Sequence, residues 1–245
     1  MSFRLELRNV SFWHGENTIL DSVDLTVPPG DVAIVGGRSG SGKSTLLELC
    51  AGLTKPRGGA VLWNDDDITG MSRYELYGRR KSMGYVFQGH ALISNHSAFD
   101  NIALPLKCGA ADLGSEAIEK RVRALMGELG IGREIEKRFP EALSAAQLKC
   151  VAVARALVSE PALLILDEPF SGIDPVTANM IASVLHGRWK RGGMSIIMAS
   201  HSLGTWPEHG AQRFMLNGGR LEPAEEAFAK VRNLKYNQRY GHDAK

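Results

Sequence analysis

One stretch of eight residues constrains this chain more than any other part of its sequence. Residues 37–44 read GRSGSGKS, which fits the pattern G-x-x-x-x-G-K-[ST] without deviation. In that pattern the glycines let a loop turn its backbone N–H groups toward a phosphate, while the lysine and the hydroxyl reach the outer phosphates and Mg²⁺. The pattern requires a strand before the loop and a helix after it. Residues 32–35 and 44–50 meet this requirement, which disfavours a plain glycine-rich surface turn.

The composition places the chain among ordinary globular proteins. Of its 245 residues 44% are hydrophobic and 23% are charged, which disfavours disordered, collagen-like and coiled-coil classes. The formal charge of +2 is too balanced to attract nucleic acid, so we expect no nucleic-acid partner and only a local anion site. Charges at Arg4, Glu6 and Arg8 are atypical of a secretory signal, and no apolar run approaches the roughly 20 residues that span a bilayer. These features predict a cytoplasmic protein.

Hydrophobic periodicity divides the chain into strand-rich and helical stretches. Two strands separated by a turn come first, and later short apolar strands alternate with helices, as in an α/β fold. After about residue 89 the strand signals stop until about residue 160, and apolar residues recur with helical period. The sequence predicts an α/β core with an N-terminal antiparallel β portion and a helical insertion. The predicted strands are 3–10, 18–27, 32–35, 60–63, 84–87, 163–166, 195–199 and 213–216, and the predicted helices include 44–50, 115–129 and 178–189.

A second motif ends one of the buried strands. Residues 163–168 read LLILDE, an aliphatic run followed by two carboxylates. In such a place Asp167 would lie beside the Mg²⁺ of a nucleotide. Glu168 would lie beside the terminal phosphate, where a carboxylate orients or deprotonates a water molecule. The alternative is a strand that ends in a solvated turn, but the phosphate loop in the same chain favours the first interpretation.

A third feature lies at the start of a helix. Ser144 and Gln147 have the S-x-x-Q spacing of a capping box, in which two side chains satisfy backbone N–H groups at a helix N-terminus without any ligand. Taken alone, this spacing indicates only a structural role. The order of the motifs along the chain changes that interpretation.

The motifs follow one another in a characteristic series. After the phosphate loop come YVFQ at 85–88, LSAAQ at 143–147, LLILDEP at 163–169, SGID at 171–174 and ASH at 199–201. This series resembles the nucleotide-binding subunit of ABC transporters over nearly the whole chain. The resemblance implies one ATPase domain with a P-loop, RecA-like fold, which binds and hydrolyses ATP with Mg²⁺. The implied parts are an α/β core (1–88 and 161–222), a helical subdomain (89–160) and a C-terminal tail (223–245).

The resemblance also implies which residues carry the chemistry. Glu168, His201 and Gln88 are implied as the catalytic residues. Ser44, Gln88 and Asp167 are implied as the ligands of Mg²⁺.

ATP in this family lies between the phosphate loop of one copy and the signature segment, here residues 143–147, of a second copy placed head to tail. The adenine ring is expected to stack on Trp13 or on His14, and the sequence does not choose between the two rings. The residues implied in ATP binding besides these two are Gly37, Ser39, Gly40, Gly42, Lys43, Ser44, Thr45, Ser144, Gln147 and Asp174.

Two stretches make the resemblance narrower. Residues 71–106 and the later DEPFSGIDPVTA look like the ATPase subunit of Mla-type transporters, which work with Mce-domain proteins to move phospholipids between bacterial membranes. Permease subunits and an Mce-domain protein are the implied partners, with this chain on the cytoplasmic face of the inner membrane. Leu92, Ile93 and Phe99 would then form part of the permease docking groove, or pack as ordinary core residues.

One segment departs from the family pattern. Ala145 and Ala146 stand where the family normally carries two glycines. Glycine allows a close backbone approach to a phosphate, whereas alanine favours the helix by about 1 kcal/mol per residue. Lys149 and Cys150 stand where related chains often show arginine pairs, so positive charge near this helix is reduced.

Two other functions stay open at this point. The chain could be the ATPase subunit of an importer for another solute, because the permease and the substrate-binding protein choose the substrate. It could also be a regulatory ATP-binding subunit with weak hydrolysis, owing to Ala145 and Ala146. The basic stretch from residue 230 onward is expected either to fray in solvent or to anchor on the partner ATPase subunit through Val231, Leu234, Tyr236 and Tyr240.

Overall fold

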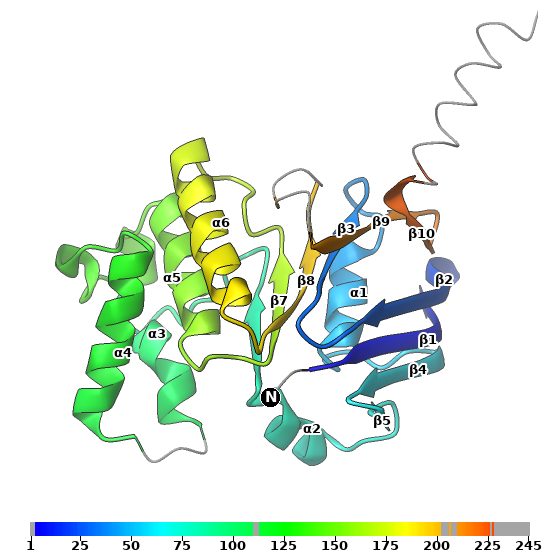
Figure 1. The fold of residues 1–245 in the computed structure, drawn as a ribbon, viewed down its shortest axis with the longest axis horizontal. Coiled ribbons are helices and arrows are strands. Elements are labelled where there is room, and N and C mark those ends of the chain that lie inside the picture. The colour runs from blue at the N-terminus through cyan, green and yellow to red at the C-terminus, as the bar shows by residue number, and fades with distance from the viewer. Residues whose placement is uncertain (1–2, 110–112, 202–205, 207–209, 226, 228–245) are drawn as a thin grey trace, which may run out of the picture.

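A sheet of mostly parallel strands lies at the centre of the molecule (Figure 1). The computed structural model describes residues 3–109, 113–201, 206, 210–225 and 227. The strand order is β10-β9-β3-β8-β7-β6, in which β10 runs antiparallel to β9 and the other neighbours are parallel. The strands are β3 (Val32–Gly36), β6 (Met83–Val86), β7 (Leu163–Asp167), β8 (Ser195–Ala199), β9 (Ala211–Asn217) and β10 (Arg220–Pro223). The segments that follow β3, β6, β7 and β8 therefore leave the sheet on the same side, at the carboxyl ends of these strands.

Helices cover both faces of this sheet. Every residue of β3, β7 and β8 is buried, as expected for parallel strands between two helical layers. Alternate residues of β7 serve opposite faces: Leu164 and Leu166 pack in the apolar cluster of α5 and α6, whereas Leu163 and Ile165 pack in that of α1. The helices are α1 (Lys43–Cys50), α2 (Arg73–Arg80), α3 (Ala98–Lys107), α4 (Ser115–Glu128), α5 (Ala145–Leu157) and α6 (Pro175–Lys190).

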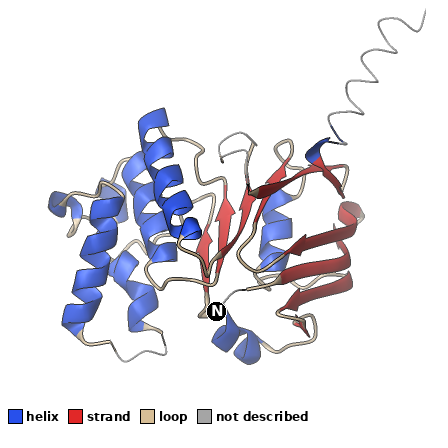
Figure 2. Ribbon diagram, in the orientation of Figure 1, coloured by secondary structure: helices blue, strands red, loops and turns tan. Residues whose placement is uncertain are grey.

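A second, antiparallel sheet is formed mainly by the N-terminal strands and lies at the right of Figure 2. Its order is β2-β1-β4-β5. The strands are β1 (Leu5–His14), β2 (Asn17–Val27), β4 (Gly58–Trp63) and β5 (Asp66–Asp67). The predicted fold class, an α/β core with an N-terminal antiparallel β portion, is confirmed.

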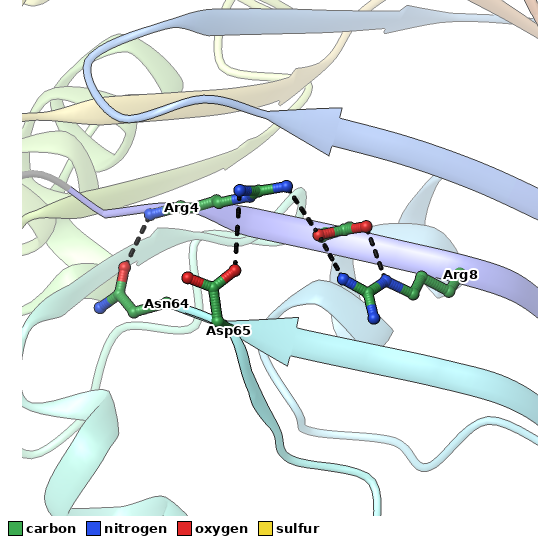
Figure 3. Close-up of polar contacts among 5 residues, drawn as sticks. Arg4, Arg8, Asn64 and Asp65 are labelled. Atoms are coloured by element: carbon green, nitrogen blue, oxygen red, sulfur yellow. Dashed lines mark hydrogen bonds and ion pairs between the residues drawn. The ribbon is translucent and has the colours of Figure 1, made fainter.

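Ion pairs connect partly exposed and exposed side chains of the antiparallel sheet (Figure 3). Glu6 pairs with Arg4 at 3.0 Å and with Arg8 at 2.7 Å, and Arg4 lies 3.6 Å from Asp65. Asn64 and Asp65 form the tight turn between β4 and β5 with φ of 51° and 72°, and the Asn64 side chain accepts the Arg4 N–H. Exposed ion pairs contribute only about 0–1 kcal/mol each. The buried face of the sheet therefore supplies most of its stability.

The helices α3, α4 and α5 lie together at the end of the molecule farthest from the antiparallel sheet (Figure 1). Two 3₁₀ turns, η1 (Arg133–Ile135) and η2 (Pro140–Ala142), connect α4 to α5. One apolar cluster runs from these three helices through α6 to β7 and β8. The sequence predicts a boundary at residue 160 between the helical subdomain and the α/β core. Because the apolar core continues across this residue, that boundary stays a prediction.

Some elements differ in extent from the sequence prediction. Helix α6 begins at Pro175 rather than at 178, because Asp174 caps the helix and proline is well suited to its first turn. Strand β1 continues to His14 rather than ending at 10, because His14 pairs with Asn17 across a tight turn. The short elements α2, β5 and β10 were not predicted.

Gly84 allows α5 to approach β6, and replacing it by alanine tests this packing. A Cβ at this position would lie 2.2 Å from the Ala156 backbone oxygen in α5. We expect Gly84→Ala to lower the free energy of unfolding by about 1–3 kcal/mol, measured by denaturant titration. Gly78→Ala in α2 is the control, because its Cβ meets no atom within 4 Å and alanine favours a helix by roughly 0.5–1 kcal/mol. Equal stability of the two variants would contradict the close approach.

Candidate functional site

The loop between β3 and α1 depends on its glycines. Gly37, Gly40 and Gly42 have φ of 154°, 75° and 101°. A Cβ at Gly37 would lie 2.7 Å from the Leu216 backbone oxygen, so this position requires glycine. Gly42 caps α1 without a side-chain hydrogen bond, which leaves the first N–H groups of the helix without a side-chain partner. A helix N-terminus of this kind attracts anions.

Lys43 is the first residue of α1 and lies inside the loop. Only 6% of the surface of Lys43 is exposed. The Nζ atom donates hydrogen bonds to the backbone oxygens of Gly37, at 2.9 Å, and Arg38, at 3.1 Å. It also lies 3.7 Å from Glu168 Oε1. The ammonium group therefore lies between the loop and the end of β7.

Two carboxylates at the end of β7 face the loop. Asp167 is 4% exposed and Glu168 is 5% exposed. Glu168 Oε2 accepts the His201 backbone N–H at 3.2 Å, and Glu168 Oε1 lies 3.2 Å from His201 Nε2. Asp167 Oδ1 is buried and accepts no hydrogen bond from the described residues. The site thus holds an unused carboxylate oxygen on Asp167, and the neighbouring carboxylate of Glu168 lies beside a lysine and a histidine.

These groups surround a cavity of about 190 Å³. This volume suits phosphate groups rather than a whole nucleotide, since sites for drug-sized ligands occupy about 300–1,000 Å³. Two larger hollows, of about 540 and 680 Å³, lie near Ser82 and Ser159 and contain no predicted site residue. The cavity is lined by Ser39, Gly40, Gly42, Lys43, Ser44, Thr45, Gln88, Asp167, Glu168 and His201.

The oxygen atoms around the cavity fit a magnesium ion. A buried carboxylate oxygen without a hydrogen-bond donor, such as Asp167 Oδ1, is a suitable ligand. Ser44 and Gln88 line the same cavity and offer a hydroxyl and an amide oxygen. These three residues would hold Mg²⁺, which when bound would neutralise negative charge on phosphate groups.

Other predicted site residues do not line this cavity. Trp13 and His14 lie exposed at the end of β1, where the β1–β2 hairpin turns. Ser144 and Gln147 lie at the start of α5, and the reciprocal capping box is formed: the Ser144 N–H donates to Gln147 Oε1 at 2.9 Å, and the Gln147 N–H donates to Ser144 Oγ at 3.3 Å. Ser144 and Gln147 therefore cap the N-terminus of α5, as their spacing indicates, and the cap needs no ligand.

Asp174 also acts as a helix cap. Its Oδ1 accepts the N–H groups of Val176, at 3.0 Å, and Thr177, at 2.9 Å, at the start of α6. The Thr177 hydroxyl and N–H hold the pKa of this carboxyl below its usual value. The carboxylate therefore stays ionised at neutral pH, exposed at the surface beyond β7.

The sequence interpretation missed the part that Lys149 plays. This lysine in α5 is only 1% exposed, and its Nζ donates a 3.0 Å hydrogen bond to the backbone oxygen of Glu168. Burial lowers the pKa of the ammonium group, and the charges of Asp167 and Glu168 oppose this effect. The signal available in the sequence was the position of Lys149 within the apolar run of the helix.

A second missed residue, Arg155, joins α5 to the segment after β6. Its guanidinium donates to the backbone oxygens of His90, at 2.9 Å, and Ala91, at 2.8 Å. Both of these residues have left-handed φ, 64° and 48°. Arg155 therefore supports an unfavourable backbone conformation just after Gln88.

Comparison with known proteins now identifies the family. The family model described as "ABC transporter" matches residues 20–171. The ATP-binding protein MlaF of the intermembrane phospholipid transport system in Escherichia coli is 35% identical over 199 residues, which cover 81% of this chain and 73% of MlaF. This chain belongs to the ABC transporter family. The predicted resemblance, to the family and to its Mla-type ATPase subunits, is confirmed.

Other relatives of the chain transport a different substrate. The methionine import ATP-binding protein MetN 1 of Rhodopseudomonas palustris is 38% identical over 206 residues, or 84% of this chain. The chain spans about half the length of that relative, 54%. The relatives therefore agree on an ATP-binding subunit but not on the transported molecule.

Solved ABC cassettes share the fold. The dimeric structure of the bacterial ABC transporter cassette MJ0796 has a TM-score of 0.83 and 28% identity, covering 89% of this chain and 96% of that one. A post-hydrolysis structure of the same cassette, bound to ADP and phosphate, is equally similar, with a TM-score of 0.83. The predicted P-loop ATPase fold is confirmed. Among the described residues, no helix has the length and apolar character needed to cross a membrane.

Lys43 and Ser44 test the phosphate site. We expect Lys43→Ala and Ser44→Ala each to weaken Mg-ATP binding roughly 10- to 100-fold, the effect of losing a hydrogen bond or ligand to a charged group. Titration with a fluorescent ATP analogue measures the dissociation constant. Lys55→Ala, which removes an exposed lysine outside the cavity, is the control and should bind normally. Unchanged affinity in both site variants would contradict the assignment.

Proposed function

We propose that this chain binds ATP with Mg²⁺ and hydrolyses it to power a membrane transporter. The observation that carries the proposal is the position of Glu168. Its buried carboxylate lies between Lys43 and His201 at the wall of the phosphate-sized cavity. A carboxylate in this position can accept a proton from a water molecule beside the terminal phosphate.

The proposed reaction assigns a role to each side chain at the cavity. Glu168 takes a proton from water as the water oxygen bonds to the terminal phosphorus and the bond to ADP breaks. Lys43 and the N-terminus of α1 stabilise the negative charge on the phosphate groups. The backbone nitrogen and Nε2 of His201 each lie 3.2 Å from a carboxylate oxygen of Glu168, and His201 thereby orients the carboxylate.

Glu168→Gln tests the proposed base. Glutamine keeps the size of the side chain but accepts no proton, so we expect hydrolysis to fall by roughly 10²-fold or more while ATP binding is retained. Turnover and ATP affinity are measured separately. Glu119→Gln, on the exposed face of α4, is the matched control. Near-normal turnover in Glu168→Gln would make His201 the next candidate for the base.

The proposal includes a second copy of the chain, placed head to tail. ATP would lie between the phosphate loop of one copy and residues 143–147 of the other. Ser144 and Ala145 are exposed and Ser144 does not line the cavity, which suits contact with a nucleotide held by another molecule. The dimeric structure of the MJ0796 cassette supports the pairing of two copies.

The two alanines that begin α5 test this arrangement. If the backbone at Ala145 and Ala146 must approach the terminal phosphate, their methyl groups hinder closure of the dimer but not ATP binding at Lys43. We expect the double variant Ala145→Gly, Ala146→Gly to lose up to about 1 kcal/mol of helix stability per site, yet to hydrolyse ATP faster with unchanged affinity. Equal turnover would show that the alanines are tolerated, and the proposal of a weakly hydrolysing regulatory subunit would lose its basis.

We propose phospholipid as the transported molecule, in a transporter of the Mla type. MlaF supports this choice, because the match covers 73% of its length. Methionine or another imported solute is the alternative, supported by MetN 1. Purification of the tagged full chain from membranes separates the two. An Mce-domain protein among the partners supports lipid transport, whereas a solute-binding protein supports import.

The permease is proposed to dock on the segment after Gln88. Leu92, Ile93 and Phe99 are partly buried there, and Leu92 and Phe99 pack against the apolar core with part of their surface left exposed. Docking would hold the chain on the cytoplasmic face of the bacterial inner membrane. The tail residues proposed to contact the partner ATPase subunit, Val231 to Tyr240, lie outside the described residues.

A further inference from the structure

Lys149 is a charged residue in an otherwise apolar part of α5. Only 1% of its surface is exposed, and its neighbours Cys150, Val151 and Ala152 are all buried. Burial of a charge is costly unless a polar partner compensates it. Among the described residues, the Lys149 side chain makes one hydrogen bond, from Nζ to the backbone oxygen of Glu168 at 3.0 Å. An apolar side chain of similar length would fill the same space without this cost, so the charge calls for an explanation beyond packing.

The residue that receives this hydrogen bond has an unfavourable backbone conformation. Glu168 has a φ of 49°, in the left-handed region that side-chain-bearing residues rarely adopt. Such a conformation persists only where the surroundings hold it from several sides. The Glu168 N–H donates to the Ala199 backbone oxygen at 3.0 Å, and the Ser171 N–H donates to the Glu168 oxygen at 3.2 Å. Lys149 supplies a further contact, and it comes from a different part of the fold.

We propose that Lys149 is a positioning residue for ATP hydrolysis: by holding the backbone oxygen of Glu168, it sets the direction in which the Glu168 carboxylate enters the site. The inference rests on the proposed function, in which Glu168 is the base. A misplacement of about 1 Å at a reacting group can cost 10²-fold in rate. The orientation of this one peptide group is therefore sufficient to control turnover without changing nucleotide affinity.

The same contact connects the base to the signature segment. Lys149 lies four residues after Ala145, so the two side chains share one face of α5. Any shift of α5 when residues 143–147 meet the nucleotide of the second copy would move Lys149 Nζ and, with it, the turn at Glu168. Arg155 extends this connection, because it joins α5 to the backbone of His90 and Ala91.

Lys149→Met tests the proposal, because methionine keeps an unbranched apolar stem and removes the donor and the charge. We expect kcat for ATP hydrolysis by the purified full chain to fall between about 10- and 100-fold. ATP affinity should stay within two-fold, and the thermal unfolding temperature should change little, because removal of a costly buried charge is offset by the loss of its attraction to Asp167 and Glu168. Lys149→Gln keeps a shorter N–H donor and should recover part of kcat. Lys120→Met, on the exposed face of α4, should behave as the native chain.

A double variant separates positioning from general damage. In a Glu168→Gln background the base is already lost, so Lys149→Met should lower the residual rate by less than two-fold. A structural defect would instead lower both rates by the same factor.

Three results would overturn the inference. They are native kcat in Lys149→Met, a loss of kcat with a matching loss of ATP affinity or thermal stability, and a full additional loss in the Glu168→Gln background. If Lys149→Met does not fold, Lys149→Gln carries the same comparison in both backgrounds. Absence of hydrolysis in the native chain, or native turnover in Glu168→Gln alone, would instead count against the proposed function.

Discussion

The candidate site depends on the parallel pairing of β3, β8 and β7. In this register Val35 and Asp167 both lie beside Ala199, so the three strands end at the same level. The phosphate loop, the two carboxylates and His201 leave the sheet there, side by side. These strands are buried at every position and divide their aliphatic side chains between two cores. A slip of one residue would move each side chain to the wrong core, so the packing that stabilises the fold also holds the site in register.

Buried charge is concentrated at this one edge. In the part of the chain that the structure describes, the buried charged residues are Lys43, Lys149, Asp167 and Glu168, two of each sign. They meet from three segments: the phosphate loop, the end of β7 and α5. The ion pairs of the antiparallel sheet in Figure 3 are different, because water screens them and each contributes little. Charges that stay buried are costly, and three of these, Lys43, Asp167 and Glu168, line the cavity where a polyphosphate and Mg²⁺ would compensate them.

Helix α5 connects three segments of the proposed site: the signature segment at residues 143–147, the turn after β7 and the turn after β6. It begins at the capping box of Ser144 and Gln147, and its first two residues are the alanines that depart from the family pattern. Farther along, Lys149 contacts the turn after β7 and Arg155 contacts the turn after β6. A single rigid element therefore reaches the proposed dimer contact, the base and the segment proposed to meet the permease. Such an arrangement suits a cassette in which nucleotide and partner must influence one another.

The sequence by itself determined the features whose chemistry lies in neighbouring residues. The glycines of the phosphate loop, the aliphatic runs of the buried strands and the two carboxylates after β7 are local patterns, and a local pattern specifies a turn or a strand without reference to the rest of the chain. The contacts between distant residues were decided only by the tertiary structure. His201 meets Glu168 across 33 residues. Trp13 and His14 are both exposed, so their burial favours neither as the adenine partner. Lys149 is the clearest case, because a lysine in a sequence suggests a solvated surface. The apolar run around it is a local signal of burial, but its contact with Glu168 depends on the packing of α5 against the sheet, which the sequence of the helix does not specify.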